Sequence, residues 1–182
     1  MADPSFDIHP KTKGSYRRRA EDIDRVLRNL RLEGLSREAT FLIYYFACEK
    51  LAKIIIGVST KKPASNYFEK NYSLRINNIK LSCKKLGTPV SEEDIDWIFT
   101  SACDGPKWKL FLSSAPDTWI LSSLKSPKSA RWLRNKMVHD IGPTHAKLTR
   151  QHAMFLNRKM KKFLSLSTAV VRYLEVGHKT GS

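Results

Sequence analysis

Length, composition and charge limit the classes of protein to which this chain can belong. Its 182 residues include 41% hydrophobic side chains, enough for one domain with a buried core and too many for a disordered chain. The 33 Lys and Arg outnumber the 17 Asp and Glu, and the net charge of +16 favours a polyanionic partner. Nucleic acid is the first candidate, ahead of an acidic membrane surface or an acidic partner protein.

Cysteine usage and the N-terminal residues indicate the compartment. The three cysteines, Cys48, Cys83 and Cys103, are widely spaced and form no Cys-x-x-Cys motif, so the sequence predicts neither disulfides nor a zinc site. Residues 1–16 lack the apolar run of a secretory signal and predict a loosely ordered arm. We therefore expect a cytoplasmic protein.

The first predicted helix follows this arm, and a second helix begins after a short turn. Apolar residues recur at helical spacing at Ile23, Val26, Leu27 and Leu30. Gly34 is a candidate for the left-handed residue that ends the first helix. Ser36 carries the hydroxyl that N-capping positions prefer, so we expect it to open the second helix.

The second helix, over about residues 37–57, is apolar around most of its circumference, as is usual for the central helix of a bundle. Its charged residues Glu49, Lys50 and Lys53 also exclude a membrane span. Glu49 and Lys53 stand four residues apart in the order that favours an ion pair, which is the simplest interpretation of both. The alternative is that they support a functional site.

The middle of the chain predicts a loop at 59–73, a short basic helix at 74–86 and a well-capped helix after Ser91. Glu92, Glu93 and Asp94 fill the first turn of that capped helix, and its apolar side is Ile95, Ile98 and Phe99. An irregular insert at about 104–127 contains Trp108 and Trp119, so we expect it to pack against another part of the chain.

Two further helices are predicted in the last third. One runs from Lys128 to Ile141, where Gly142 and Pro143 stop it. The final helix, about 145–175, precedes a tail at 176–182 and has an apolar set formed by Leu148, Met154, Phe155, Leu156, Met160, Phe163 and Leu164. Its basic set is Arg150, Arg158, Lys159, Lys161 and Lys162.

These elements define one all-α domain over residues 17–175. No segment alternates in the way a strand requires, and no internal repeat is present. We predict an up-down four-helix bundle with an extended middle insert.

The stretch RWLRNKMVHD, residues 131–140, holds the candidate site. On a helical wheel Ala130, Leu133, Met137 and Ile141 fall within roughly 80° and form a core-facing stripe. Asn135 and His139 share the opposite face with Trp132. Arg134 is roughly 140° from His139, but its side chain is long enough to reach the same groove. The simplest interpretation is a solvated helix face, although an outward Trp132 favours burial against another surface.

Arginine, histidine and asparagine together supply the groups that RNA cleavage needs without a metal. A guanidinium matches phosphate oxygens, an imidazole transfers protons near neutral pH, and an amide orients either group. With these, the 2′-OH of RNA attacks its adjacent phosphate. The sequence has no metal-binding motif and no phosphate loop. A symmetric dimer would bring two copies of each group to one phosphate.

Two stretches of the sequence resemble a known family. RNKMVHD resembles the R-x4–6-H signature of HEPN domains, and FACEKLAKIII at 46–56 resembles an early helix of their bundles. The resemblance implies a homodimer through the motif helices, no cofactor, and a metal-independent RNA endonuclease of toxin–antitoxin or phage-defence systems. Arg134 and His139 would then be catalytic and Asn135 supporting, with an antitoxin or other neutralising protein as a partner. Some toxin members have a tyrosine two residues after the histidine, where this chain has Ile141, so regulation by modification there is in doubt.

Basic residues near the motif are candidates for holding RNA: Arg131, Lys136, Arg158, Lys159 and Lys162. The alternative function is a non-catalytic HEPN-like module that binds RNA or a protein. It would use the final helix and the arm through Arg17, Arg18, Arg19, Lys159, Lys161 and Lys162. Membrane-surface association of the final helix is a third possibility, disfavoured because the bundle already uses its apolar stripe.

Overall fold

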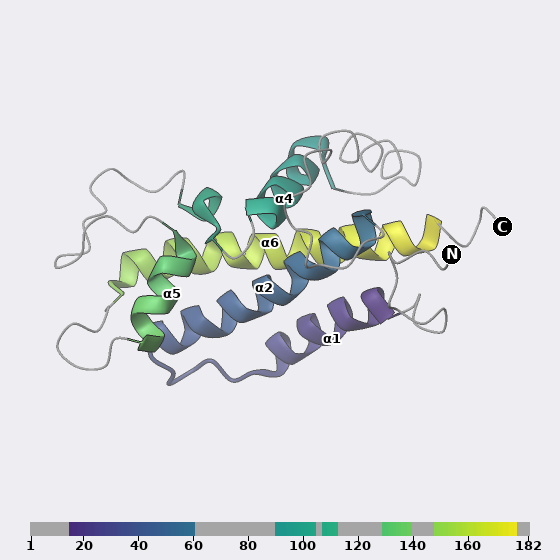
Figure 1. The fold of residues 1–182 in the computed structure, drawn as a ribbon. Coiled ribbons are helices and arrows are strands. Elements are labelled where there is room, and N and C mark those ends of the chain that lie inside the picture. Colours follow the sequence, from purple (N-terminus) through teal and green to yellow (C-terminus); the bar gives the residue numbers. More distant parts are fainter. Residues whose placement is uncertain (1–14, 61–89, 105–106, 113–128, 140–147, 178–182) are drawn as a thin grey trace.

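The computed structural model describes residues 15–60, 90–104, 107–112, 129–139 and 148–177, and within these ranges it has helices and no strand. The all-α class is thus confirmed. The elements are α1 (Ser15–Asn29), α2 (Arg37–Thr60), α4 (Glu92–Asp104), the 3-10 turn η3 (Lys109–Phe111), α5 (Ala130–His139) and α6 (Arg150–Gly177) (Figure 1). The basic helix expected at 74–86, Cys83, Trp119 and Ile141 lie outside the described residues.

Helices α2 and α6 form the centre of the fold and run in the same direction (Figure 1). Their N-terminal ends are joined where the Leu148 amide donates to Glu38 Oε1 at 2.7 Å. One-third of the way along α6, the buried Cys48 thiol donates to the Met160 carbonyl oxygen at 3.6 Å. The prediction of a central second helix is confirmed, because α2 contacts α1, α4, α5 and α6.

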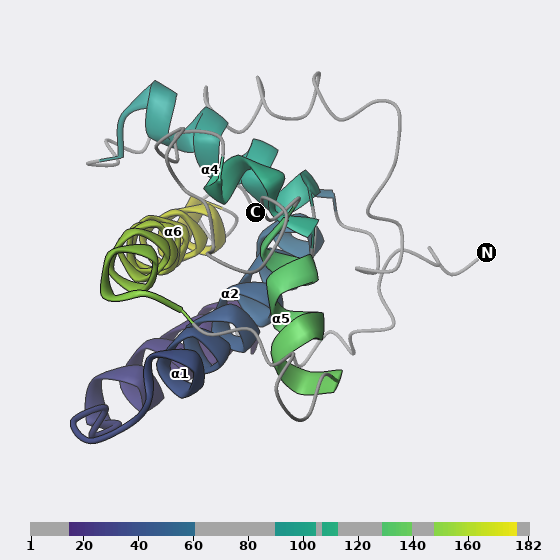
Figure 2. The same cartoon turned by 90° about the vertical axis from the view of Figure 1, so that its left-hand side faces the viewer.

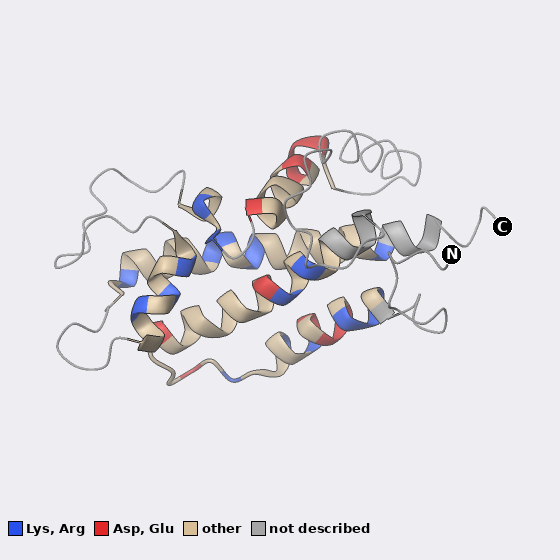
Figure 3. Ribbon diagram, viewed as in Figure 1, with Lys and Arg blue, Asp and Glu red and all other residues tan. Residues whose placement is uncertain are grey.

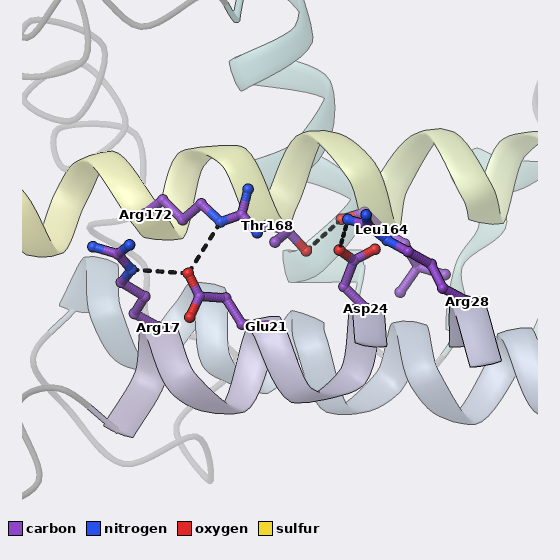
Figure 4. Close-up of polar contacts among 7 residues, drawn as sticks. All are labelled: Arg17, Glu21, Asp24, Arg28, Leu164, Thr168 and Arg172. Carbon is purple, nitrogen blue, oxygen red and sulfur yellow. Dashed lines mark hydrogen bonds and ion pairs between the residues drawn. The ribbon is translucent and has the colours of Figure 1, made fainter. Parts of the chain in front are cut away.

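Helix α1 packs antiparallel to α6 through the buried Ala20 and neighbouring apolar side chains, and an ion pair also joins the two helices (Figure 4). Glu21 Oε1 accepts from Arg17 Nε at 2.9 Å and from Arg172 Nε of α6 at 3.2 Å. Of the four apolar residues at helical spacing, Ile23 and Leu27 pack against the core, whereas Val26 and Leu30 are 55% and 39% exposed. Helical periodicity identified one face of α1 but not how much of it a neighbour covers.

The prediction that Gly34 ends the first helix is wrong. Helix α1 ends at Asn29, so Gly34 does not cap it, although Gly34 has the expected left-handed backbone with φ of 85°. Ser36 caps α2 as predicted, because its Oγ accepts from the Ala39 amide at 3.1 Å.

Helix α4 lies on the opposite side of the α2–α6 pair from α1 (Figure 1). Ser91 Oγ accepts from the Asp94 amide at 3.1 Å, and Ile95, Ile98 and Phe99 are buried, as predicted. The described part of the insert, residues 107–112, also packs inward through the fully buried Trp108.

Helix α5 lies across one end of α2 (Figure 2). Ser129 caps it, accepting from the Trp132 amide at 3.1 Å. Ala130, Leu133 and Met137 are buried, which confirms the predicted core-facing stripe over the described residues. Because the stripe fixes the rotation of α5, it also fixes where the candidate site residues lie.

Helix α6 begins at Arg150, a few residues later than predicted, and most of its apolar set is buried. Met154 departs from that set, because it is 63% exposed on the outer side of the helix. None of the helices in the described ranges has the length and apolar character that crossing a membrane requires.

Candidate functional site

Arg134, the predicted catalytic arginine, lies over a tyrosine of α2. Its Cζ is 5.4 Å from the centre of the Tyr45 ring. The side chain is half-buried, and its Nε is buried without a hydrogen-bond acceptor among the described residues. No carboxylate in the described ranges forms an ion pair with Arg134, so its positive charge is not neutralised there.

Tyr45 is fully buried in an aromatic cluster. Its ring meets that of Trp108 edge-on, with centres 4.9 Å apart, and the ring of Phe41 at 6.0 Å. Burial raises the pKa of Tyr45, and hydrogen bonding and charge from Arg134 offset part of that rise. Tyr45 is therefore a neutral phenol at physiological pH, and the site has one cation beside an uncharged ring.

His139 lies at the last position of α5 and is exposed. Asn135, one turn earlier, is half-buried. Within the described residues no hydrogen bond or ion pair joins Arg134 to His139, and five residues of helix separate the two positions by roughly 140° around α5. A phosphate that contacts both groups would have to lie near the end of the helix or between two chains.

Trp132, for which we expected an outward position buried against another surface, is partly covered by the core of its own chain. It is half-buried, packs against the edge of the core, and has Lys136 Nζ 6.0 Å above its ring. The other exposed apolar side chain of α5 is Val138, which is 43% exposed and adjoins His139. Val138 is thus the available apolar contact beside the candidate site.

Glu49 and Lys53 pair with each other, as the simplest interpretation of the sequence predicted. Lys53 Nζ is 3.9 Å from Glu49 Oε1. The negative charge of Glu49 is near enough to Tyr45 to add to the rise of the tyrosine pKa. Glu49 is therefore close to the site, although its ion pair is with Lys53 and not with Arg134.

Two helical segments, α5 and α6 as far as Arg172, contain many basic and no acidic residues, and we call their basic residues together the basic surface. From Ala130 to His139 and from Arg150 to Arg172 the chain has no Asp or Glu. The basic residues there are Arg131, Arg134, Lys136, Arg150, Arg158, Lys159, Lys161, Lys162 and Arg172. Figure 3 shows blue positions on α5, η3, α6 and α1, and acidic positions on α4, on α1, at the start of α2 beside α5 and in the middle of α2.

Some of these cations also hold the fold together. Lys162 Nζ is 2.7 Å from Asp94 Oδ1 and 5.2 Å from the centre of the Trp97 ring, so it fastens α6 to α4. Lys161 lies over the ring of Tyr44 at 5.4 Å. Of the predicted RNA-binding residues, Arg131 and Arg158 are exposed and Lys136 is half-buried.

The positive charges close to Lys159 affect its pKa. Burial lowers the pKa of Lys159, and repulsion from Lys162 and Arg158 lowers it further. An anion placed there would relieve this repulsion. By contrast, a shallow groove beside α1 contains acids that pair with its arginines, among them Asp22 with Arg25 at 2.6 Å, and offers less to an anion.

Tyr45 is the site residue that sequence reasoning missed, because its helix is so apolar that every aromatic in it was assigned to the core. The available signal was its hydroxyl, since a buried tyrosine needs a polar partner.

No three His, Cys, Asp or Glu side chains gather into a metal-binding group in the described ranges. Comparison with protein-family models, curated proteins and solved structures found no match to this chain.

Proposed function

We propose that this chain is a metal-independent RNA endonuclease with the up-down four-helix bundle of HEPN domains. The observation that carries the proposal is the concentration of basic residues on α5 and α6, with an exposed His139 at the end of α5 and an Arg134 that forms no ion pair within the described part of the chain. RNA is a polyanion, so such a surface would bind its backbone with affinity that salt weakens. Arg131, Lys136, Arg158 and Lys159 would contact phosphates.

In the proposed reaction a histidine removes the proton from the 2′-OH, and the resulting oxygen attacks the adjacent phosphorus. The bond from phosphorus to the 5′ oxygen breaks, and that oxygen receives a proton. The products are a 2′,3′-cyclic phosphate and a 5′-OH end. Arg134 stabilises the charge on the phosphate oxygens, and Asn135 orients the phosphate or the imidazole.

Two chains would build one such site, because one His139 cannot be both base and acid at once. A twofold interface along α5 would supply a second histidine and a second arginine. Val138, exposed beside His139, would lie in that interface. Val138→Asp should convert a dimer to a monomer and abolish cleavage, whereas Val26→Asp, at a 55% exposed position of α1, should do neither. Light scattering coupled to size exclusion measures the change.

Cleavage of a labelled RNA in EDTA tests the reaction itself. Wild type should cut it and leave 5′-OH ends, and an RNA with a 2′-deoxy sugar at the cut should stay intact. His139→Ala and Arg134→Ala should lower the rate at least about a hundredfold with unchanged helicity, because acid–base groups contribute about that much or more. Arg25→Ala on α1 is the matched control and should cut normally. Uncut RNA with wild type, or equal cutting by the alanine variants, would refute the nuclease.

The second candidate is a binding module that holds RNA without cutting it. It is favoured by the extent of the basic surface, which continues well beyond His139 to Lys161. In that case RNA keeps its length while binding to wild type and His139→Ala equally. The same surface would suit an acidic antitoxin or other neutralising protein, which would compete with RNA.

A further inference from the structure

The contact between Tyr45 and Arg134 is an unusual way to hold a half-buried cation. Buried arginines are ordinarily paired with carboxylates. Here the guanidinium lies 5.4 Å from the centre of a fully buried ring, its Nε has no acceptor in the described residues, and no ion pair there engages it. Neither an aromatic face nor a hydrogen bond to a neutral phenol cancels the charge of the guanidinium, so Arg134 keeps its full positive charge for another anion.

The Tyr45 ring is itself held in place by neighbouring aromatic rings. Trp108 meets it at 4.9 Å, and the Trp108 ring stacks on Phe111 with centres 5.0 Å apart. Trp108 has a left-handed backbone, φ 41° and ψ 53°, which is strained for so large a side chain and persists only where packing enforces it. Packing on several sides therefore leaves Tyr45 one position.

We propose that Tyr45 is a positioning residue, whose ring holds the Arg134 guanidinium toward the scissile phosphate of RNA. This inference rests on the proposed function. A carboxylate in the place of the ring would fix the arginine equally well but would cancel the charge that the phosphate needs. Without the ring, the long arginine side chain would sample many rotamers, and each turnover would include the cost of ordering it.

The test compares three variants with the full-length wild type. Tyr45→Phe keeps the ring, Tyr45→Leu removes it, and Phe41→Leu removes a neighbouring buried ring that contacts Tyr45. We expect Tyr45→Phe to retain kcat within about threefold. Tyr45→Leu should lower kcat about tenfold or more with KM little changed, in line with a desolvated cation–π contact. Phe41→Leu should leave kcat near wild type. Equal losses in Tyr45→Leu and Phe41→Leu, or no loss in Tyr45→Leu, would overturn the proposal.

A second measurement is independent of cleavage and separates this proposal from the nuclease. The NMR signal of the Arg134 Nε–Hε group, assigned by its absence in Arg134→Lys, should exchange slowly with water in wild type and Tyr45→Phe. It should exchange fast in Tyr45→Leu. If wild type cuts no RNA, the nuclease fails while this signal still tests the positioning. An Nε–Hε signal in Tyr45→Leu as protected as in wild type would overturn it.

Discussion

Arg28 and Arg134 are held in different ways, and the difference decides how available each is to a ligand. Arg28 of α1 pairs with Asp24, and that carboxylate raises the arginine pKa. Arg134 instead lies on a neutral ring. An arginine beside a carboxylate must give up its partner before it can bind another anion, whereas one beside a ring keeps its full charge. Residue type and total charge alone do not distinguish the two.

Glu21 gives a pH prediction at the same scale. Its pKa lies below the ordinary 4.5, mainly because Arg17 donates a hydrogen bond to it, with added attraction from Arg17 and Arg172. A carboxyl group whose pKa is lowered by folding stabilises the fold above its unfolded pKa and loses this contribution as pH falls through the folded pKa. Since the side chain is partly exposed, we expect Glu21→Gln to cost only about 0.5 kcal/mol at pH 7.

Urea denaturation at pH 7 and at pH 3 measures this cost. The difference between wild type and Glu21→Gln should be present at pH 7 and shrink toward zero at pH 3. Glu33→Gln, in the turn after α1, is the control and should show no such trend. A difference that grew on acidification would contradict the assigned role of the ion pairs.

At the scale of the element, α5 depends on a few buried side chains. Leu133 is fully buried in the middle of this ten-residue helix, whereas Val138 is 43% exposed. Leu133→Ala removes buried methyl groups and leaves a cavity, with a cost of about 3 kcal/mol. Because α5 is short and lies at one end of α2, we expect local detachment to carry most of that cost.

Hydrogen–deuterium exchange measures the local detachment of α5 directly. Amides of α5 should exchange about a hundredfold faster in Leu133→Ala, while those in the middle of α2 change little. Val26→Ala, at a 55% exposed position of α1, should leave both unchanged, since exposed substitutions seldom exceed about 0.5 kcal/mol. Equal acceleration in α2 and α5 would mean that Leu133 supports the whole bundle instead of α5.

The sequence correctly predicted features that depend on neighbouring residues in the chain, such as helix caps and buried stripes. It did not predict contacts that depend on which helices pack together. Periodicity located the buried stripe of α5, and hydroxyl side chains located the caps at Ser36 and Ser91. Met154 matched the periodicity of its helix but lies where no neighbour covers it. The contact of Arg134 with Tyr45 joins two helices far apart in the chain, so only their crossing in space defines it.

On the scale of the whole molecule, charge is distributed unevenly around the parallel pair α2 and α6. Acidic residues lie mainly on α4 and α1. By contrast, the charged side chains of α5 and of the described part of α6 are all basic (Figure 3). If the chain binds RNA as proposed, such asymmetry would orient the molecule toward this polyanion before any close contact forms, and counterion release would supply much of the affinity.

The salt dependence of RNA binding tests whether this surface is the one used. An RNA with 2′-O-methyl sugars cannot undergo 2′-OH attack, so it isolates binding from cleavage. If Arg131, Arg158 and Lys161 each neutralise one phosphate, replacing any of them by Ala should flatten the plot of log Kobs against log salt by about 0.7. The affinity should fall by similar factors for unrelated RNA sequences.

Arg25→Ala, at an exposed position of α1, is the control and should leave the slope unchanged. Fluorescence anisotropy titrations at several salt concentrations supply the slopes, and equal slopes for all four variants would place the RNA on another face of the molecule.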